Sequence, residues 1–522
     1  MNRLILLTLA IFFLLYWASL VNANDQHESV GERIKLSYLG AYKLGPYNSG
    51  AAEIASFDPT TKRVFVTNSH DRSVDVISLI KPDSPKLDFS INLTQYGAIN
   101  SVAVKNTMVA IAVSAKRPQD NGLILLFSTG GEMLNKFTVG PMPDMVTFSA
   151  DGKYLLSANE GEPNADYSID PEGSISIIEL QKDLKALSQE SVQTADFKQF
   201  NRDNIDPNIR IFGKNASVAQ DLEPEYISIS PDSTTAWVSL QENNALAEVS
   251  LKHAQVKRLY ALGYQDHSAK LNGFDASDKD QQINIKSWPV KGMYQPDSIA
   301  TYEAKGEFYI VSANEGDARD YEGFSEQSRV KNLNLEPLLK SQNLQYDEQL
   351  GRLKVSVVGA DPDQNGLIDT LYSFGSRSFS IWNQDVVQIY DSGSQFEQIT
   401  ARDYPKLFNL GDRRSDDKGP EPEALTIGKI GDSSYAFIGL ERTGGIMTYN
   451  ITEPENSFFV DYLNTISPHL ERSDPMAGDI APESLVFISA ADSPSAQPLL
   501  IAANEGSGTL SIYRIDRTDP KD

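Results

Sequence analysis

Cysteine is absent from the 522 residues, and histidine occurs only five times. The lack of cysteine excludes disulfides, thiolate metal sites and a cysteine nucleophile. A chain without disulfides must be stabilised by a large apolar core, which a chain of this length can form. The histidines are scattered, and the sequence has no HExxH pattern, no Ser-His-Asp spacing and no glycine-rich phosphate loop. The common hydrolase motifs are therefore missing.

Positive charge is also scarce, with 46 Lys and Arg against 71 Asp and Glu, which gives a net charge of −25. Such a surface repels nucleic acid and anionic membranes and attracts cations. We therefore expect no nucleic-acid partner. We also expect a monomer whose ligand, a small molecule or a surface group, is unknown.

Long apolar runs occur only at the start of the chain. Arg3 precedes a mostly apolar run from Leu4 to Trp17, and Val21 and Ala23 form a small-x-small cleavage site. This pattern predicts a signal peptide over residues 1–23, followed by one domain over residues 24–522 in the periplasm or outside the cell. An uncleaved membrane anchor is the alternative, and no later segment is long enough to span a bilayer.

Long helical patterns are rare, and a repeat takes their place. Each unit reads as strand, polar turn, strand, tight turn, strand. The seven units begin at Ala52, Ile99, Pro143, Pro224, Pro296, Pro422 and Pro482. Stacked units of this kind predict an all-β, seven-bladed β-propeller, with loop insertions in blades 3 to 5 and with Ile34 to Leu44 as the outer strand that closes the ring. Two β-sandwiches in tandem would not produce seven alignable units.

Acidic residues recur at two positions of the repeat. One precedes the first strand of six units, and another follows the second strand, within Asn-Glu-Gly in three units. Because the second strand runs antiparallel to the first, both positions should lie at one mouth of the central channel. Arginines at or near equivalent positions join this candidate ligand-binding set, which comprises Glu53, Asp144, Glu160, Glu225, Asp297, Glu315, Arg319, Arg329, Glu423, Arg442, Glu483 and Glu505.

Two interpretations of these acids remain open. Converging carboxylates can bind a cation, so a second divalent metal, in addition to the calcium site described below, is possible at the mouth. They can also bind a phosphate that is held together with a metal and the arginines. Alternatively, each acid accepts backbone N–H bonds and fixes the start of a strand, and the arginines form salt bridges. We expect the insertion from Glu322 to Gly359 to fold over the channel and bring Arg329 toward the ligand.

A separate motif, DPDQNGLIDT from Asp361, resembles a calcium loop. Asp361, Asp363, Asn365 and Asp369 supply oxygen ligands at calcium-loop spacing, Leu367 supplies a carbonyl, and Gly366 makes the bend. Tyr372 stands where a bidentate acid would complete the loop. The motif predicts Ca²⁺ binding, with a solvated Asx-rich turn as the alternative.

Several longer strings, SANEGDARDYEGFSEQSRV, DPDQNGLIDTLYSFGSRSFSIWN, GPEPEAL and ERTGGIMTYNIT, resemble the choice-of-anchor I family of exported proteins. That family is similar to animal mesenchyme-specific cell surface glycoproteins, and some members are labelled alkaline phosphatases. The resemblance implies a propeller outside the cytoplasm, often joined to variable surface anchors, and gives no catalytic residues. We therefore expect an exported calcium-binding propeller that acts as a ligand-binding or interaction module, with a metal-dependent phosphoesterase as the alternative.

Overall fold

Short antiparallel strands rich in Val, Ile, Phe and Tyr make up most of the chain. The structure, a computed structural model, describes residues 33–181, 183–201 and 205–518, and residues 34–516 form one unit. The predicted signal peptide lies outside the described residues. Within them, no helix is long and apolar enough to cross a bilayer.

Seven four-stranded sheets occur in the described part of the chain, and each contains one of the repeat units, so we number the sheets 1 to 7 in that order. Sheet 1 consists of β2 (Ala55–Asp58), β3 (Arg63–Asn68), β4 (Ser73–Ser78) and β5 (Lys86–Asn92). Sheet 2 consists of β6 (Ile99–Lys105), β7 (Met108–Val113), β8 (Asn121–Ser128) and β9 (Met133–Pro141). Sheet 3 consists of β10 (Pro143–Phe148), β11 (Tyr154–Asn159), β12 (Ser174–Glu179) and β13 (Val192–Asp196).

Sheets 4 to 7 follow the same plan. Sheet 4 consists of β14 (Ile227–Ile229), β15 (Thr235–Leu240), β16 (Ala245–Ser250) and β17 (Gln255–Ala261), and sheet 5 of β20 (Ile299–Ala304), β21 (Glu307–Asn314), β27 (Ser378–Asn383) and β28 (Gln388–Asp391). Sheet 6 consists of β29 (Pro422–Ile430), β30 (Ser433–Leu440), β31 (Ile446–Asn450) and β32 (Phe458–Leu463). Sheet 7 consists of β33 (Pro482–Ile488), β34 (Leu499–Asn504), β35 (Thr509–Thr518) and β1 (Arg33–Lys43).

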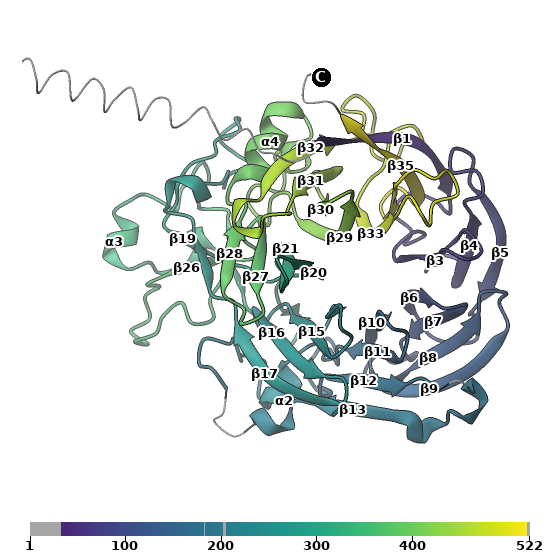
Figure 1. Cartoon of the computed structure of the whole chain (residues 1–522). Helices are drawn as coiled ribbons and strands as arrows, with labels where there is room; N and C mark the ends of the chain where they lie inside the picture. Colours follow the sequence, from purple (N-terminus) through teal and green to yellow (C-terminus); the bar gives the residue numbers. More distant parts are fainter. Residues whose placement is uncertain (1–32, 182, 202–204, 519–522) are drawn as a thin grey trace, which may run out of the picture. The chain divides into compact units, whose positions relative to one another are not determined.

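The first strands of the sheets surround a central channel. In order, β2, β6, β10, β14, β20, β29 and β33 each contact the next, and β33 contacts β2. Figure 1 shows the same sheets arranged around an open centre. The segment before unit 1 becomes β1 and pairs with β35 as the outer strand of sheet 7. The predicted all-β propeller fold is confirmed, and tandem sandwiches are excluded.

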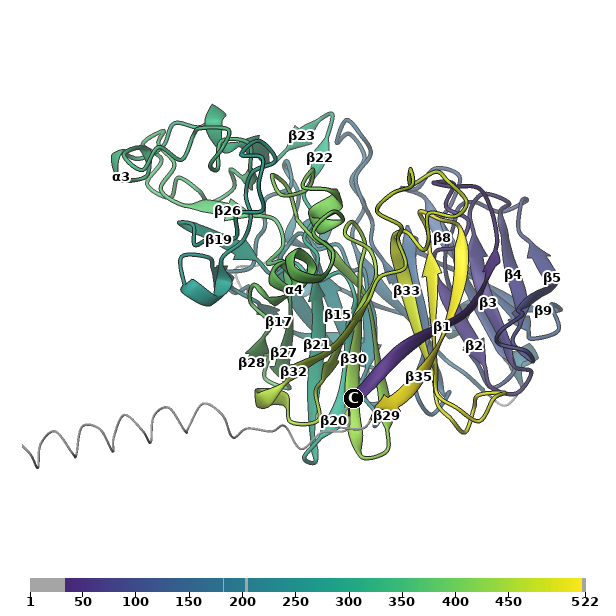
Figure 2. The same ribbon diagram turned by 90° about the horizontal axis from the view of Figure 1, so that it is seen from above.

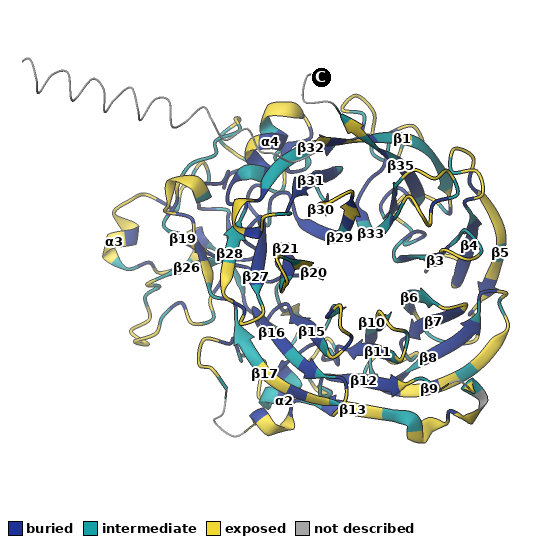
Figure 3. Ribbon diagram, viewed as in Figure 1, coloured by how far each residue is buried: buried dark blue, intermediate teal, exposed yellow. Residues whose placement is uncertain are grey.

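The core lies between neighbouring sheets. The second strand of each sheet is mostly buried. All six residues of β7 are buried, as Figure 3 shows, and so are all six of β34. Val66 of sheet 1 packs in one cluster with Ile501 of sheet 7, and Val76 packs in another with Ile111 of sheet 2. Burial of each such side chain contributes about 1.5–3 kcal/mol, so adjacent sheets stabilise one another and position their ends.

The insertions form further structure. A five-stranded sheet combines β18 (Tyr264–Asp266), β19 (Val290–Met293), β26 (Leu371–Ser373), β25 (Lys354–Ser356) and β24 (Gln327–Arg329), and β22 (Asp320–Tyr321) pairs with β23 (Phe324–Ser325). The α-helices are α2 (Val218–Asp221), α3 (Pro337–Lys340) and α4 (Gln395–Asp403). Single 3₁₀ turns lie at Leu184–Ala186, Gln189–Ser191, Lys198–Phe200, Lys270–Asn272, Val330–Asn332, Phe408–Leu410 and Pro454–Asn456.

The position of the largest insertion differs from the prediction. In both views α3, β19 and β26 lie to one side of the ring of sheets and not over its centre (Figures 1 and 2). The reason is that this segment forms its own apolar core, in which Phe274, Leu350 and Leu371 pack together. Most of the insertion is therefore a separate lobe beside sheet 5.

Candidate functional site

β-Bulges place acidic side chains at the start of the inner strands. The antiparallel register is interrupted between Pro143 and Met145, between Pro422 and Leu425, and between Pro482 and Ser484. A bulge bends its strand and redirects a side chain, and bulges are common beside binding sites. The backbone also has a positive φ at four residues that each lie two positions before a channel acid: Met142, Gln295, Glu421 and Ala481. The same local distortion is therefore built repeatedly at one end of the channel.

The returning second strands bring a second acid to the same end. Pro143 pairs with Asn159, Pro422 with Leu440 and Pro482 with Asn504. The residues that follow these partners are Glu160, Glu441 and Glu505, which accordingly lie beside Asp144, Glu423 and Glu483. This is the arrangement that the repeat pattern predicts.

The three residues of the Asn-Glu-Gly motif have separate tasks. Asn314 is fully buried and donates from Nδ2 to the hydroxyls of Ser378 and Ser380 at 3.2 and 2.9 Å, which ties β21 to β27. Asn159 makes the same pair of bonds between β11 and β12. Gly316 has φ of +89°, and a Cβ there would lie 2.0 Å from the nitrogen of Gly375, so only glycine fits. The glutamate between them is left to face the channel.

A cavity of about 310 Å³ occupies this end of the channel. Four acids from four sheets line it: Glu53, Asp144, Asp297 and Glu483. Asn100 of sheet 2 also lines it, at the position where those four sheets carry an acid. A second cavity of about 720 Å³ adjoins it, because both are lined by Ser69, Ala98, Ile99 and Asn100. The cavity lined by the four acids thus extends toward sheet 2.

The carboxylates raise one another's pKa values. Burial and then the charges of Glu505 and Asp144 raise the pKa of Glu53 to about 7, although a bond from Ser69 opposes the shift. Burial raises the pKa of Asp144 to about 6, with a contribution from Glu162. Burial also raises the pKa values of Glu242 and Glu441 to about 8, with contributions from Asp317 and Glu315 respectively. Without a cation, Glu53, Glu242 and Glu441 therefore retain protons near neutral pH.

Most of the channel acids have no partner in the protein. In the described ranges, no hydrogen bond or ion pair reaches the carboxylates of Asp144, Glu160, Glu225, Asp297, Glu423, Glu483 and Glu505. Glu225, Glu242 and Glu423 each keep a buried carboxylate oxygen without any partner. Acids that only fixed strand starts would accept backbone N–H bonds. The structural interpretation therefore does not account for this set.

Two of the three predicted arginines pair with acids away from the channel acids. Arg319 is 1% exposed; it pairs with Asp221 and with Glu223 at 2.8 Å, and stacks on Phe212. Arg329 lies in the lateral lobe, 2.6 Å from Asp416. The expectation that the insertion brings Arg329 to the mouth is therefore wrong.

The third arginine and an unpredicted lysine form a paired group at the edge of the mouth. Arg442 lies 2.7 Å from Glu441 and 3.3 Å from Glu421. Lys418 Nζ lies 2.6 Å from Glu315 Oε1 and 3.6 Å from Glu421. Gln241 Nε2 donates to the other oxygen of Glu315 at 3.0 Å. Glu315 is therefore held in place by two partners.

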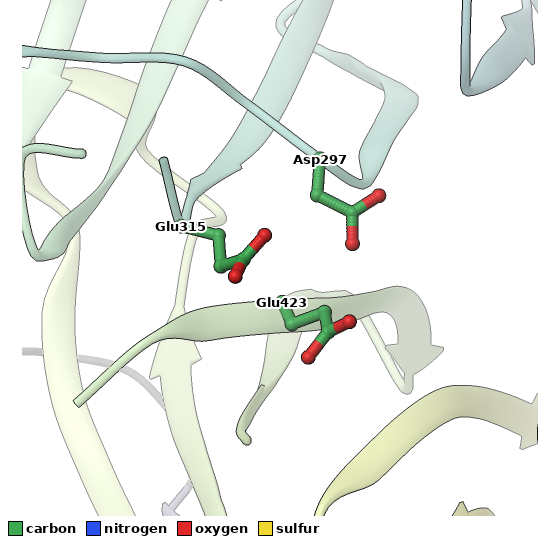
Figure 4. A group of neighbouring side chains, drawn as sticks. All are labelled: Asp297, Glu315 and Glu423. Carbon is green, nitrogen blue, oxygen red and sulfur yellow. The ribbon is translucent and has the colours of Figure 1, made fainter. Parts of the chain in front are cut away.

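Two groups of channel acids converge closely enough to hold a metal ion. In one, ligand oxygens of Asp297, Glu315 and Glu423 all lie within 4.8 Å of one another, and Figure 4 shows the three side chains gathered at one place. In the other, Glu315 is joined by Glu421 and Glu441. Carboxylate oxygens at this spacing suit hard divalent cations.

The calcium-like loop is a third acidic group. Oxygens of Asp361, Asp363 and Asp369 lie within 4.8 Å of one another. The loop closes when the N–H groups of Asn365 and Gly366 donate to Asp361 at 3.1 and 2.9 Å, and Asn365 Oδ1 accepts from Leu367 N at 2.7 Å. Tyr372 has already entered β26, so the twelfth position cannot contribute.

Glu336 is a further acid at this loop that the sequence analysis missed. Its Oε1 accepts a bond from Asn365 Nδ2 at 3.1 Å, and its charge contributes, after burial and Asp363, to a raised pKa of Asp369. Glu336 comes here because Leu335 pairs in parallel with Ile368. That pairing of distant segments carries no local sequence signal. For Lys418 and Glu421 a signal existed, since Lys418 directly precedes the GPEPEAL string and Glu421 lies within it.

The choice-of-anchor I domain matches residues 53–454, which include all seven unpartnered acids except Glu483 and Glu505. The chain belongs to the choice-of-anchor I family. This choice-of-anchor I protein is 34% identical over 198 residues to Gigasin-3a of Magallana gigas, covering 34% of this chain and 69% of that protein. It is 27% identical over 227 residues to the mesenchyme-specific cell surface glycoprotein of Strongylocentrotus purpuratus, covering 35% of this chain and 29% of that protein.

Two solved structures are similar over most of the choice-of-anchor I chain. The match to Kuenenia stuttgartiensis hydrazine synthase covers 90% of this chain and 97% of that chain, at 11% identity and a TM-score of 0.47. The match to the streptogramin B lyase structure covers 93% of this chain and 98% of that chain, at 10% identity and a TM-score of 0.44. Neither likeness bears on activity.

Proposed function

We propose that this protein is an exported ligand-binding or interaction module, and that its ligand places a positive charge in the acidic end of the channel. The observation that carries the proposal is the set of seven carboxylates without partners in the described residues. Glu160 and Glu423 are buried and the other five are half-buried. Carboxylates shielded from water are costly when they are neither paired nor hydrogen-bonded. A bound metal ion or an organic cation would neutralise them.

Location outside the cytoplasm is part of the same proposal. One relative is named a cell surface glycoprotein, and the first 23 residues have the pattern of a signal peptide. The absence of cysteine is compatible with export because the propeller is stabilised by clusters between all neighbouring sheets and needs no disulfide.

Calcium binding at the Asp361–Asp369 loop is a further proposal. The three aspartates are close enough to coordinate one ion, and Gly366 has φ of +85°, which allows the sharp bend that such loops need. Glu336 lies where it could replace the missing twelfth ligand. Since this loop belongs to the lateral lobe, a calcium ion there would stabilise the lobe.

The phosphoesterase alternative is less well supported. A phosphate needs free cationic donors, but Arg319, Arg329 and Arg442 all pair with carboxylates. Turnover of p-nitrophenyl phosphate by the purified protein, with calcium and with chelator, would test this alternative. Metal-dependent turnover that Glu423→Gln abolishes would favour it over a binding module.

Equilibrium binding of spermidine and of Ca²⁺ tests the proposed module directly. The variant Asp144→Asn/Glu483→Gln removes two channel charges and keeps the side-chain shapes. We expect it to bind spermidine, an organic trication, at least about tenfold more weakly than the wild type, because two of the unpartnered charges are lost. Glu132→Gln, at an exposed turn, is the matched control and should change nothing. Equal spermidine affinity in all three proteins would argue against the channel as the binding site.

A further inference from the structure

We propose that Asp297, Glu315 and Glu423 bind one divalent metal cation between sheets 5 and 6, with Lys418 as the fixed counter-charge of the site. This inference rests on the proposed function and specifies its ligand, a metal ion as opposed to an organic cation. The three acids come from the start of β20, the end of β21 and the start of β29.

The geometry suits one ion. The ligand oxygens of the three acids lie within 4.8 Å of one another, and their side chains gather at one place in Figure 4. Oxygen ligands lie about 2.3–2.6 Å from Ca²⁺, so two of them on opposite sides of an ion are about 5 Å apart. One ion can therefore contact all three acids without movement of the backbone.

The lack of partners for two of the three acids is a second, independent observation. Glu423 is 9% exposed, and its Oε2 is buried without a hydrogen-bond partner. In the described part of the chain, Asp297 has no hydrogen-bond or ion-pair partner for its carboxylate either. A buried oxygen that lacks a partner costs about 1–3 kcal/mol, and more when it is charged. Coordination of a metal would remove that cost.

Charge distinguishes this group from the neighbouring one. In their ionised form, Asp297, Glu315 and Glu423 carry three negative charges, and Lys418 compensates one of them through its 2.6 Å contact with Glu315. A divalent ion would neutralise the remaining two. A monovalent ion would leave one buried charge uncompensated.

The neighbouring group, Glu315 with Glu421 and Glu441, already has its cations. Glu421 lies 2.6 Å from Arg414, and Arg442 lies within 3.3 Å of both Glu421 and Glu441. Together with Lys418, which also lies 3.5 Å from Asp317, three cations face these three acids. The acids of this group are each paired with a cation already, so we assign the ion to the first group.

The proposed ion would remain accessible from the channel. Asp297 also lines the cavity of about 310 Å³ that contains Glu53, Asp144 and Glu483. Three protein ligands do not fill the six to eight positions of Ca²⁺ or the six of Mg²⁺. The open positions would face the cavity, where water or an oxygen atom of a further ligand can complete the coordination.

Calorimetric titration with Ca²⁺, Mn²⁺ and Mg²⁺ tests this site. All proteins carry Asp363→Ala to weaken the loop site, and all are first treated with chelator. We expect this parent to bind one divalent ion per chain at the mouth. Adding Glu423→Gln or Asp297→Asn should weaken that binding at least tenfold, because each replaces a charged ligand by a neutral one. Adding Glu132→Gln, at an exposed turn outside the channel, should change it less than threefold.

The outcomes separate the inference from the proposed function. Equal metal affinity with and without Glu423→Gln and Asp297→Asn, in proteins with unchanged circular dichroism, would overturn the site. If spermidine binds to the channel but no divalent ion does, the inference fails and the proposed binding module stands. If neither binds, both fail. Use of two variants on different strands ensures that misfolding of one does not decide the result.

Discussion

Single residues of the Asn-Glu-Gly motif show what a repeat in the sequence can and cannot reveal. The recurrence itself predicted that Glu160, Glu315 and Glu505 lie at one end of the channel, and the strand registers place them there. The recurrence did not show that the asparagine holds two strands together while the glutamate faces the channel. Both are equally regular in sequence, and only the hydrogen bonds distinguish them.

Arg319 illustrates the opposite case. A charged residue beside an acidic motif suggested phosphate binding, but the guanidinium is buried between Asp221 and Glu223. Its partners lie 96 and 98 positions earlier in the chain, in the connection between β13 and β14. Contacts between two insertions have no local pattern, so the sequence could not reveal them.

Arg319→Met should therefore destabilise the protein and leave the channel intact. Removing the guanidinium leaves two buried carboxylates without their cation, at a cost of about 3–5 kcal/mol. Denaturant unfolding at neutral pH measures this loss. Arg329→Met, at a partly exposed pair, should cost less than about 1 kcal/mol. If Arg319→Met instead keeps full stability but loses ligand binding, Arg319 belongs to the binding site.

At the scale of elements, the strands of the seven sheets were predictable because each is short, alternates in polarity and is followed by a turn. The lateral lobe was not predictable beyond its existence as an insertion. Its sheet pairs β19 with β26 in parallel, although about eighty residues separate them. Such a pairing depends on the core around Phe274 and Leu371, which only the folded chain assembles.

The calcium-like loop belongs to this scale, because it connects β25 to β26. Calcium should raise the melting temperature of the wild type by mass action. Asp363→Ala should lose most of that increase, since it removes one ligand. Asp385→Ala, in the exposed turn between β27 and β28, is the control and should keep the full increase. Equal calcium responses in the three proteins, measured by differential scanning calorimetry, would show that the loop is only a solvated turn.

The charge pattern of the whole molecule predicts a dependence of stability on pH. Channel acids with raised pKa values, among them Glu53 at about 7 and Glu242 and Glu441 at about 8, hold protons more tightly when the protein is folded. Their stabilising contribution is present at low pH and is lost as pH rises through these values. Burial lowers the pKa of His267 to about 4, so this residue opposes the trend only near pH 6.5, where the unfolded chain still binds part of a proton at its imidazole.

In the absence of divalent cations, the free energy of unfolding should therefore fall between about pH 6.5 and 8.5. The slope should be about 1.4 kcal/mol per pH unit for each extra proton that the folded state holds. A divalent cation at the mouth should reduce the slope, because it replaces the protons. Urea unfolding at several pH values, with chelator and with Ca²⁺, measures both effects. Stability that rises over this range without cations would contradict the assigned pKa shifts.

The central claim is that the unpartnered acids at the channel mouth bind a cation, and a crystal structure grown with Mn²⁺ tests it most directly. Anomalous diffraction locates manganese without ambiguity. The account predicts a peak within coordination distance of Asp297, Glu315 and Glu423, at the mouth of a ring of seven blades. A channel without anomalous density, in which these carboxylates accept backbone N–H bonds, would contradict the claim, and another number of blades would contradict the architecture on which it depends.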